Sequence, residues 1–120
     1  MKTIHHFVNG KKFSGESKRV SKVFNPATGE QSAEVKLATA KDVNDAVENS
    51  KKAFDSWANK PPLQRARVMF KFKELIEKNA DELTKIIVSE HGKVYEDAKG
   101  SLTRGLEAVS YTHLRAHETV

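Results

Sequence analysis

Side chains that could carry covalent, metal or acid–base chemistry are sparse in this chain. None of its 120 residues is cysteine, so it has no thiolate nucleophile, no disulfide and no thiolate metal site. His113 and His117 have the i, i+4 spacing of two ligands on one helix face, but no third ligand accompanies them. The carboxylate pairs Asp81-Glu82 and Glu96-Asp97 suit helix caps and solvated faces. We therefore predict no catalytic residue and no metal site.

Nucleotide and histidine signals are equally weak. No Gly-x-Gly-x-x-Gly and no glycine-rich phosphate loop occurs, so the sequence pattern indicates no cofactor-binding residue. His5 and His6 are adjacent and are predicted to be surface residues. His91, beside Gly92, suits the negative end of a helix better than the role of a general base.

The composition is that of one soluble domain, with 38% hydrophobic and 31% charged residues. No apolar run approaches the roughly 18 residues of a membrane span, and no signal segment is visible, so we expect no membrane partner and a cytoplasmic location. Residues 1–24 carry six Lys and Arg against one Glu, which accounts for the whole net charge of +5. A nucleic-acid binder usually has a basic face along one element, so we expect no nucleic-acid partner.

Residues 7–37 are predicted to be strands separated by turns. Asn9-Gly10 is a strong two-residue hairpin signal, because both positions tolerate a positive φ. Residues 19–24 and 30–37 are predicted strands on either side of the turn at Asn25-Pro26.

Residues 39–109 are predicted to form four amphipathic helices. Thr39 and Asp42 indicate a capping box, and Pro61-Pro62 ends the first helix and opens the second. Asn79 resembles a further cap, Gly92 suits the end of the third helix, and the fourth is expected to begin near residue 94. The expected layout is a small β element followed by four helices.

Gly100 and Gly105 lie inside the last predicted helix, where a glycine costs about 1 kcal/mol relative to alanine. Close helix packing is the interpretation we favour, and space left for a ligand is the alternative.

Three segments in this order resemble the N-terminal part of the aldehyde dehydrogenase superfamily. They are Asn25-Pro26-Ala27-Thr28-Gly29-Glu30, then Ala53-Phe54-x-x-Trp57 with Arg65-x-Arg67, then Glu90-x-Gly92-Lys93. The resemblance covers residues 6 to about 109. It implies that residues 1–109 are an α+β fragment of an α/β enzyme and come from its coenzyme-binding domain. The superfamily attacks its aldehyde with a cysteine thiolate, so the chain alone is expected to be inactive.

Within the superfamily, Glu90-His-Gly-Lys93, Asp97-Ala-Lys-Gly100 and Arg104-Gly-Leu-Glu107 most resemble the methylmalonate-semialdehyde dehydrogenases. This resemblance implies NAD-dependent, CoA-acylating oxidation of malonate or methylmalonate semialdehyde, as in valine breakdown, by a homo-oligomer (a dimer or tetramer). NAD and CoA are cofactors of the full-length enzyme, and this fragment would not bind either of them fully.

Arg104 is the one residue that we predict to bind substrate. The implied substrate carries a free carboxylate, which a guanidinium binds with two parallel hydrogen bonds. An ion pair with Glu107 or Asp97 is the competing interpretation.

Residues 110–120 depart from the family pattern. The run from Ser110 to Thr119 resembles a translated sequencing-adapter read, and we interpret residues 110–120 as a non-native tail. Two alternatives stay open for the function. One is another aldehyde dehydrogenase subgroup, of the succinate-semialdehyde or betaine-aldehyde type, and the other is a small basic helical binding module.

Overall fold

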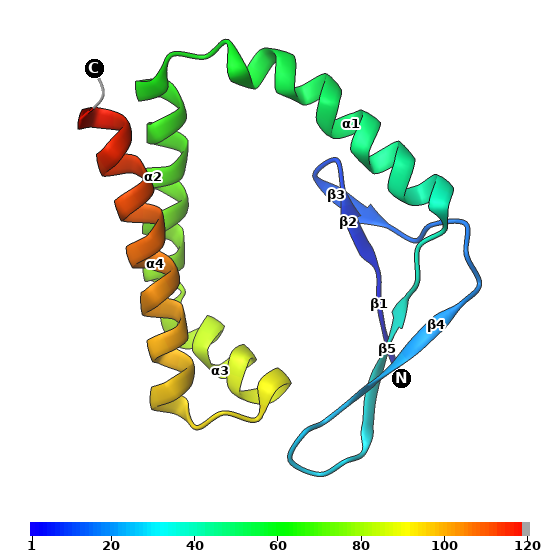
Figure 1. The fold of residues 1–120 in the computed structure, drawn as a ribbon. Helices are drawn as coiled ribbons and strands as arrows, with labels where there is room; N and C mark the ends of the chain where they lie inside the picture. Colours follow the sequence, from blue (N-terminus) through cyan, green and yellow to red (C-terminus); the bar gives the residue numbers. More distant parts are fainter. Residues whose placement is uncertain (119–120) are drawn as a thin grey trace. The chain divides into compact units, whose positions relative to one another are not determined.

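A computed structural model describes the backbone of residues 1–118 and the side chains of residues 1–111. The chain divides into two compact units, Met1–Asn59 and Lys60–Val120. The first unit holds the strands and one helix, and the second holds three helices (Figure 1). This is the predicted order of strands followed by four helices.

The first unit contains five short strands in two small sheets. β1 (Lys2–Ile4), β5 (Gln31–Lys36) and β4 (Val20–Phe24) form one sheet in the order β1-β5-β4, with β5 parallel to β1 and antiparallel to β4. β2 (His6–Val8) and β3 (Lys11–Phe13) form an antiparallel hairpin. The strand region therefore begins at Lys2 and not at residue 7 as expected. The signal at Lys2–Ile4 is three residues long, and only its pairing with β5 makes it a strand.

Turn residues set both hairpins. Asn9 and Gly10 have φ of 53° and 74°, as the two central positions of a tight hairpin turn require. In the β4–β5 turn, the Asn25 side chain accepts a hydrogen bond from the Ala27 amide at 2.9 Å. Gly29 has a φ of 74° and donates its amide to the Asn25 carbonyl at 2.8 Å. The Asn25–Glu30 motif therefore has a structural function, the closing of this turn.

Helix α1 (Ala40–Ala58) begins with the predicted capping box. The Asp42 amide donates to Thr39 Oγ1 at 3.0 Å, and the Thr39 amide donates to Asp42 Oδ2 at 2.8 Å. The Asp42 carboxylate is buried and also accepts the Glu16 amide, at 3.3 and 3.4 Å. One side chain thus closes the helix start and fixes the loop that follows β3.

The second unit is formed by α2 (Pro62–Lys78), α3 (Ala80–His91) and α4 (Tyr95–Glu118), and α4 packs against both other helices. Pro62 stands in the first turn of α2, where its missing amide hydrogen costs nothing. Gly92, with a φ of 78°, ends α3 as predicted. Asn79 is the N-cap residue of α3, as predicted, but the hydrogen bonds of a capping box are absent there. Its side chain donates backwards to the Leu75 carbonyl of α2 at 2.7 Å and makes no cap bond to α3.

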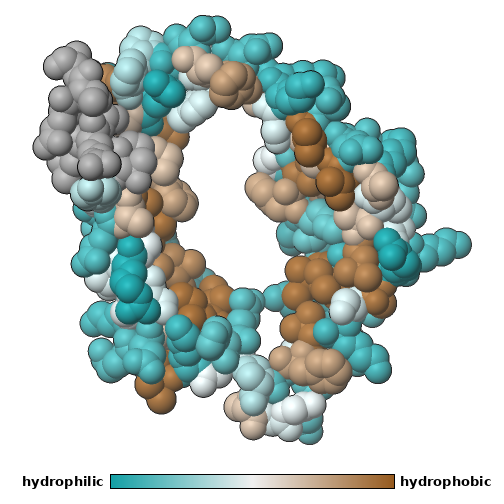
Figure 2. Space-filling view, in the orientation of Figure 1, coloured by the Kyte–Doolittle hydropathy of each residue, from teal (hydrophilic) through white to brown (hydrophobic). Residues whose placement is uncertain are grey.

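The buried part of each unit is small. Among the side chains of residues 1–111, the buried apolar residues are Ala33, Ala66 and Ala98, and Thr84 is a buried polar residue of the helical unit. Large apolar side chains stay at the surface of both units (Figure 2). They include Val43, Val47 and Phe54 on α1, and Leu63, Val68, Phe70, Phe72 and Leu75 on α2. The helices α1 and α2 therefore each keep large apolar side chains at the surface of their own unit.

No helix within residues 1–118 combines the length and apolar character needed to cross a membrane.

Candidate functional site

Arg104 lies on the exposed surface of α4 and belongs to a cluster that joins two cations to one hydroxyl. Its Nη2 donates to Ser101 Oγ at 3.1 Å. Lys93, in the short connection between α3 and α4, donates its Nζ to the same oxygen at 3.0 Å. Ser101 Oγ in turn donates to the Asp97 carbonyl at 3.2 Å. We call Lys93, Ser101 and Arg104 the cationic cluster.

The backbone places these three side chains by simple periodicity. Ser101 and Arg104 are i and i+3 on α4, so they share one face of the helix. Gly92 turns the chain from α3 into α4 and so brings Lys93 back over the first turns of α4. The sequence predicted Arg104 alone. Lys93 appeared in the sequence only as part of a family motif. For Ser101, the available signal was its i, i+3 spacing from Arg104.

Neither cation of the cluster has a carboxylate partner among the side chains of residues 1–111. The ion pairs in this range join Lys residues at other positions to Asp or Glu, and the predicted competitors Glu107 and Asp97 do not pair with Arg104. Glu107 instead lines a groove of about 470 Å³ between α2 and α4.

The two glycines of α4 differ in their surroundings. A Cβ at Gly100 would lie 3.4 Å from Arg104 Nη1, which is an ordinary van der Waals contact with the guanidinium. A Cβ at Gly105 would meet no atom of the described structure within 4 Å. Within the described residues a Cβ at either position would not contact another helix, and at Gly100 the neighbour is a side chain of the candidate site, so close helix packing stays a prediction.

Among the paired carboxylates, Asp81 has structural partners. Asp81, in the first turn of α3, accepts a hydrogen bond from Tyr95 Oη at 2.7 Å. It also forms an ion pair with Lys85 Nζ at 2.7 Å. The hydrogen bonds from Lys85 and Tyr95 lower the pKa of Asp81, and the same bond to Asp81 raises the pKa of Tyr95. A carboxylate stabilised in its charged form is a poor general base.

The histidines fall into three environments. His5 shares a hydrogen bond of 3.2 Å with Ser14, and His91 is exposed in the last turn of α3. His6 was predicted to be a surface residue, but it is half-buried and its ring lies against Phe13, with centroids 6.2 Å apart. The prediction failed because the β2–β3 pairing turns His6 inward. The side chains of His113 and His117 lie outside the described residues.

Within residues 1–111 no group of three or more His, Asp or Glu side chains is arranged to hold a metal ion.

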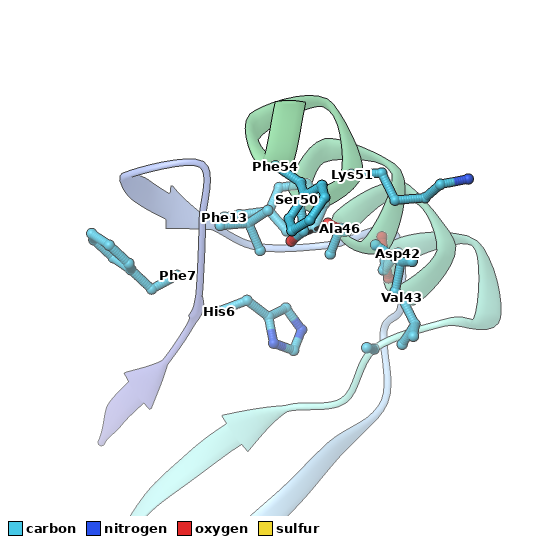
Figure 3. Close-up of a pocket in the computed structure, with 12 residues that line it drawn as sticks. His6, Phe7, Phe13, Asp42, Val43, Ala46, Ser50, Lys51 and Phe54 are labelled. Atoms are coloured by element: carbon cyan, nitrogen blue, oxygen red, sulfur yellow. Dashed lines mark hydrogen bonds between the residues drawn. The ribbon is translucent and has the colours of Figure 1, made fainter. Parts of the chain in front are cut away.

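The first unit contains an apolar groove of about 640 Å³ between α1 and the β2–β3 hairpin (Figure 3). Figure 3 shows Phe13 and Phe54 among the apolar residues that line it, with His6 and Asp42 among the polar groups. The walls are mostly aliphatic and aromatic side chains of α1 and the hairpin. His6 Nε2 is a buried nitrogen without a hydrogen-bond partner. The groove offers shape and apolar surface, while the Ser50 hydroxyl in its wall donates to the Ala46 carbonyl and Lys51 pairs with Glu48.

The start of α1 is unsuited to a dinucleotide phosphate. A helix N-terminus binds phosphate through free amides and its positive dipole. Here the Thr39 hydroxyl and the Asp42 carboxylate already occupy this end, and Asp42 adds a negative charge. The start of α1 therefore does not form a phosphate cradle.

Comparisons with known proteins agree with the fold and the motifs. The chain is 44% identical over 111 residues to a malonate-semialdehyde dehydrogenase from Pseudomonas aeruginosa, and the aligned part covers 92% of this chain and 22% of that protein. A solved methylmalonate-semialdehyde dehydrogenase from Oceanimonas doudoroffii matches with 50% identity and a TM-score of 0.89, over 94% of this chain and 23% of the other. A protein from Sinorhizobium meliloti assigned to the same activity was solved with NAD. It matches with 44% identity and a TM-score of 0.92, over 98% of this chain and 24% of the other.

The chain therefore spans less than a quarter of the length of these relatives. The aldehyde dehydrogenase family model matches residues 13–119, which is most of the sequence. That match, together with the shared fold, leads to one conclusion: the chain belongs to the aldehyde dehydrogenase family.

Proposed function

We propose that this chain is the N-terminal part of an NAD-dependent, CoA-acylating dehydrogenase of malonate or methylmalonate semialdehyde. The identities of 44–50% to relatives with these substrates in their names support the assignment. The observation that carries it is Arg104, a cation on α4 that is exposed and lacks an acidic partner among the described side chains.

Arg104 would bind the carboxylate of the substrate. A guanidinium presents a planar fork that matches a carboxylate, and a charged hydrogen bond of this kind contributes about 1.5–3 kcal/mol. The aldehyde carbon would then be held at a fixed distance from the carboxylate. Discrimination would favour aldehydes that carry an acid group over simple aldehydes.

The chemical step needs groups that this chain does not contain. It has no cysteine, so the thiolate of the proposed reaction would come from further polypeptide in a protein of the relatives' length. NAD and CoA are proposed on the basis of the family and the NAD-bound relative. No residue of this chain is assigned to either cofactor, because the α1 start is closed by its own cap.

The exposed apolar faces also suit a part of a larger protein. Phe54 is 65% exposed on α1 and Phe72 is 49% exposed on α2. We propose that the remaining polypeptide of a full-length enzyme covers these faces, and that the enzyme is a homo-oligomer.

A kinetic experiment tests the proposal. Residues 1–109 of this chain replace the matching segment of the Oceanimonas doudoroffii enzyme, and Arg104→Ala is compared with the unmodified chimera. The KM for malonate semialdehyde should rise by about tenfold or more, from the loss of a charged hydrogen bond. The KM for propanal, which has no carboxylate, should stay the same.

Equal loss on both aldehydes would contradict carboxylate recognition by Arg104. Preference of the unmodified chimera for succinate semialdehyde or betaine aldehyde would instead favour another subgroup of the family.

A further inference from the structure

We propose that Lys93 is a second carboxylate-binding cation beside Arg104, and that Ser101 is the positioning residue that holds both cations in register. This inference rests on the proposed function, because the ligand is the carboxylate of the same semialdehyde acid. It adds to that function two residues that bind or orient the acid group.

Ser101 is saturated by the contacts that it makes. A hydroxyl has one hydrogen to donate and two lone pairs to accept. Its hydrogen is donated to the Asp97 carbonyl at 3.2 Å, and its lone pairs accept Lys93 Nζ at 3.0 Å and Arg104 Nη2 at 3.1 Å. Ser101 therefore has no capacity left for a ligand, and its role is to orient the two cations.

The cations, in contrast, keep most of their donors. An ammonium has three N–H donors and a guanidinium has five. Each of these two groups donates to Ser101 Oγ, and neither forms an ion pair among the described side chains. A ligand with several acceptor oxygens would satisfy the remaining donors.

The arrangement has an electrostatic cost that an anion would remove. Both nitrogens touch the same oxygen, so two positive charges are held close together, and like charges disfavour one another. A neutral hydroxyl cannot cancel this repulsion. A carboxylate can, because its two oxygens can each accept from one cation.

The exposure of the cationic cluster and the space beside Gly100 suit a ligand site. Lys93 and Ser101 are half-buried and Arg104 is exposed, so the cluster opens to solvent on one side. Gly100, beside the guanidinium, presents no side chain there, and a Cβ would lie 3.4 Å from Nη1. The anion would approach over this glycine.

The test uses the chimeric enzyme, with malonate semialdehyde and propanal as paired substrates. Lys93→Met should raise the KM for the semialdehyde acid by about tenfold. The KM and kcat for propanal should stay unchanged, which also shows that the variant folds. Lys93→Arg should restore most of the acid preference. Lys99→Met is the matched control, since Lys99 is an exposed lysine of α4, the helix that carries Ser101 and Arg104, and lies outside the cluster.

Ser101 is tested by a conservative pair. Ser101→Ala should raise the KM for the acid several-fold without changing kcat, and Ser101→Thr, which keeps the hydroxyl, should rescue it. A structural role would reduce the activity on both aldehydes alike.

The outcomes separate this inference from the proposed function. If Arg104→Ala abolishes the acid preference and Lys93→Met leaves it intact, the role of Lys93 is overturned and the proposed function stands. If neither variant changes the preference, carboxylate recognition on α4 fails altogether. Loss on both aldehydes in Lys93→Met would make Lys93 a structural residue and overturn the inference.

Discussion

At the scale of single residues, the contact between Gly15 and Asp42 joins the loop after β3 to the start of α1. Asp42 caps α1 and accepts the Glu16 amide, and these hydrogen bonds, the Thr39 amide first, lower the pKa of its carboxyl against the opposing effect of burial. Gly15 has a φ of 71°, and a Cβ there would lie 2.9 Å from Asp42 Oδ2. Glycine is therefore required twice, by the backbone conformation and by the space that Asp42 fills.

Gly15→Ala and Gly29→Ala form a matched pair that separates these two requirements. Both glycines have a left-handed backbone, which costs a residue with a Cβ about 1–2 kcal/mol. A Cβ at Gly29 meets nothing within 4 Å, so only this cost applies there. Gly15→Ala should lower the free energy of unfolding further, because its Cβ also meets the carboxylate.

The free energy of unfolding of both variants is measured by urea unfolding, followed by the fluorescence of Trp57, the one tryptophan of the chain. In the double variant Gly15→Ala/Asp42→Ala, the cost of the Gly15 change should shrink towards that of Gly29→Ala. Equal costs for the two single variants would rule out the contact with Asp42.

At the scale of elements, the connection from α3 to α4 is fixed at both ends. Gly92 ends α3 with a left-handed residue, and Tyr95, the first residue of α4, donates its hydroxyl to Asp81 in the first turn of α3. This bond ties the beginnings of the two helices together. The connection also carries Lys93, so the link bears on the geometry of the cationic cluster.

The titration of Tyr95 reports on this link. The Asp81 carboxylate accepts a hydrogen bond from the neutral phenol and opposes its ionisation, so the pKa of Tyr95 lies above its ordinary value of 10.0. Asp81→Ala removes both effects and should move the pKa of Tyr95 down, towards 10.0. Absorbance at 295 nm measures the phenolate, in a Tyr111→Phe background that leaves one tyrosine.

Glu82→Ala is the control, because Glu82 lies in the same first turn of α3 but makes no hydrogen bond to Tyr95. An unchanged pKa of Tyr95 in Asp81→Ala would mean that the two helices are not joined in this way.

At the scale of the whole molecule, apolar surface is the dominant property. Among the described side chains the buried residues are small or polar, whereas large aromatic and aliphatic side chains of α1 and α2 are exposed (Figure 2). Contiguous exposed apolar surface favours association. The chain by itself should therefore self-associate at high concentration.

Phe54→Gln/Phe72→Gln should raise the saturation concentration of the chain and lower the fluorescence of a bound apolar dye, with the helical circular dichroism retained. Neither change alters the net charge, so a gain cannot come from charge repulsion. Ser56→Gln, on the exposed surface of α1, is the control and should change neither quantity. A double variant that is no more soluble than the parent would show that these two side chains do not drive association.

The tail at residues 110–120 stays a prediction. Helix α4 continues without a break from residue 110 to Glu118, so the backbone marks no boundary there. The described side chains end at residue 111, and the interpretation of the tail as non-native rests on its sequence alone.

The sequence by itself determined the order of elements, because their signals are local. Asn9-Gly10, the capping box at Thr39, Pro62 and Gly92 each act through backbone geometry within a few residues, and the structure has a turn or a helix end at every one. Arg104 was likewise predicted from its place in a motif. Its role in binding a carboxylate remains a proposal.

Only the tertiary structure decided the contacts between distant segments. The pairing of β1 with β5, the inward turn of His6 and the bond from Glu16 to Asp42 join residues that lie far apart along the chain or in different elements. The meeting of Lys93 and Arg104 on Ser101 depends on the angle at which Gly92 sends the chain into α4. No local pattern encodes such contacts, because their energy depends on how whole elements pack.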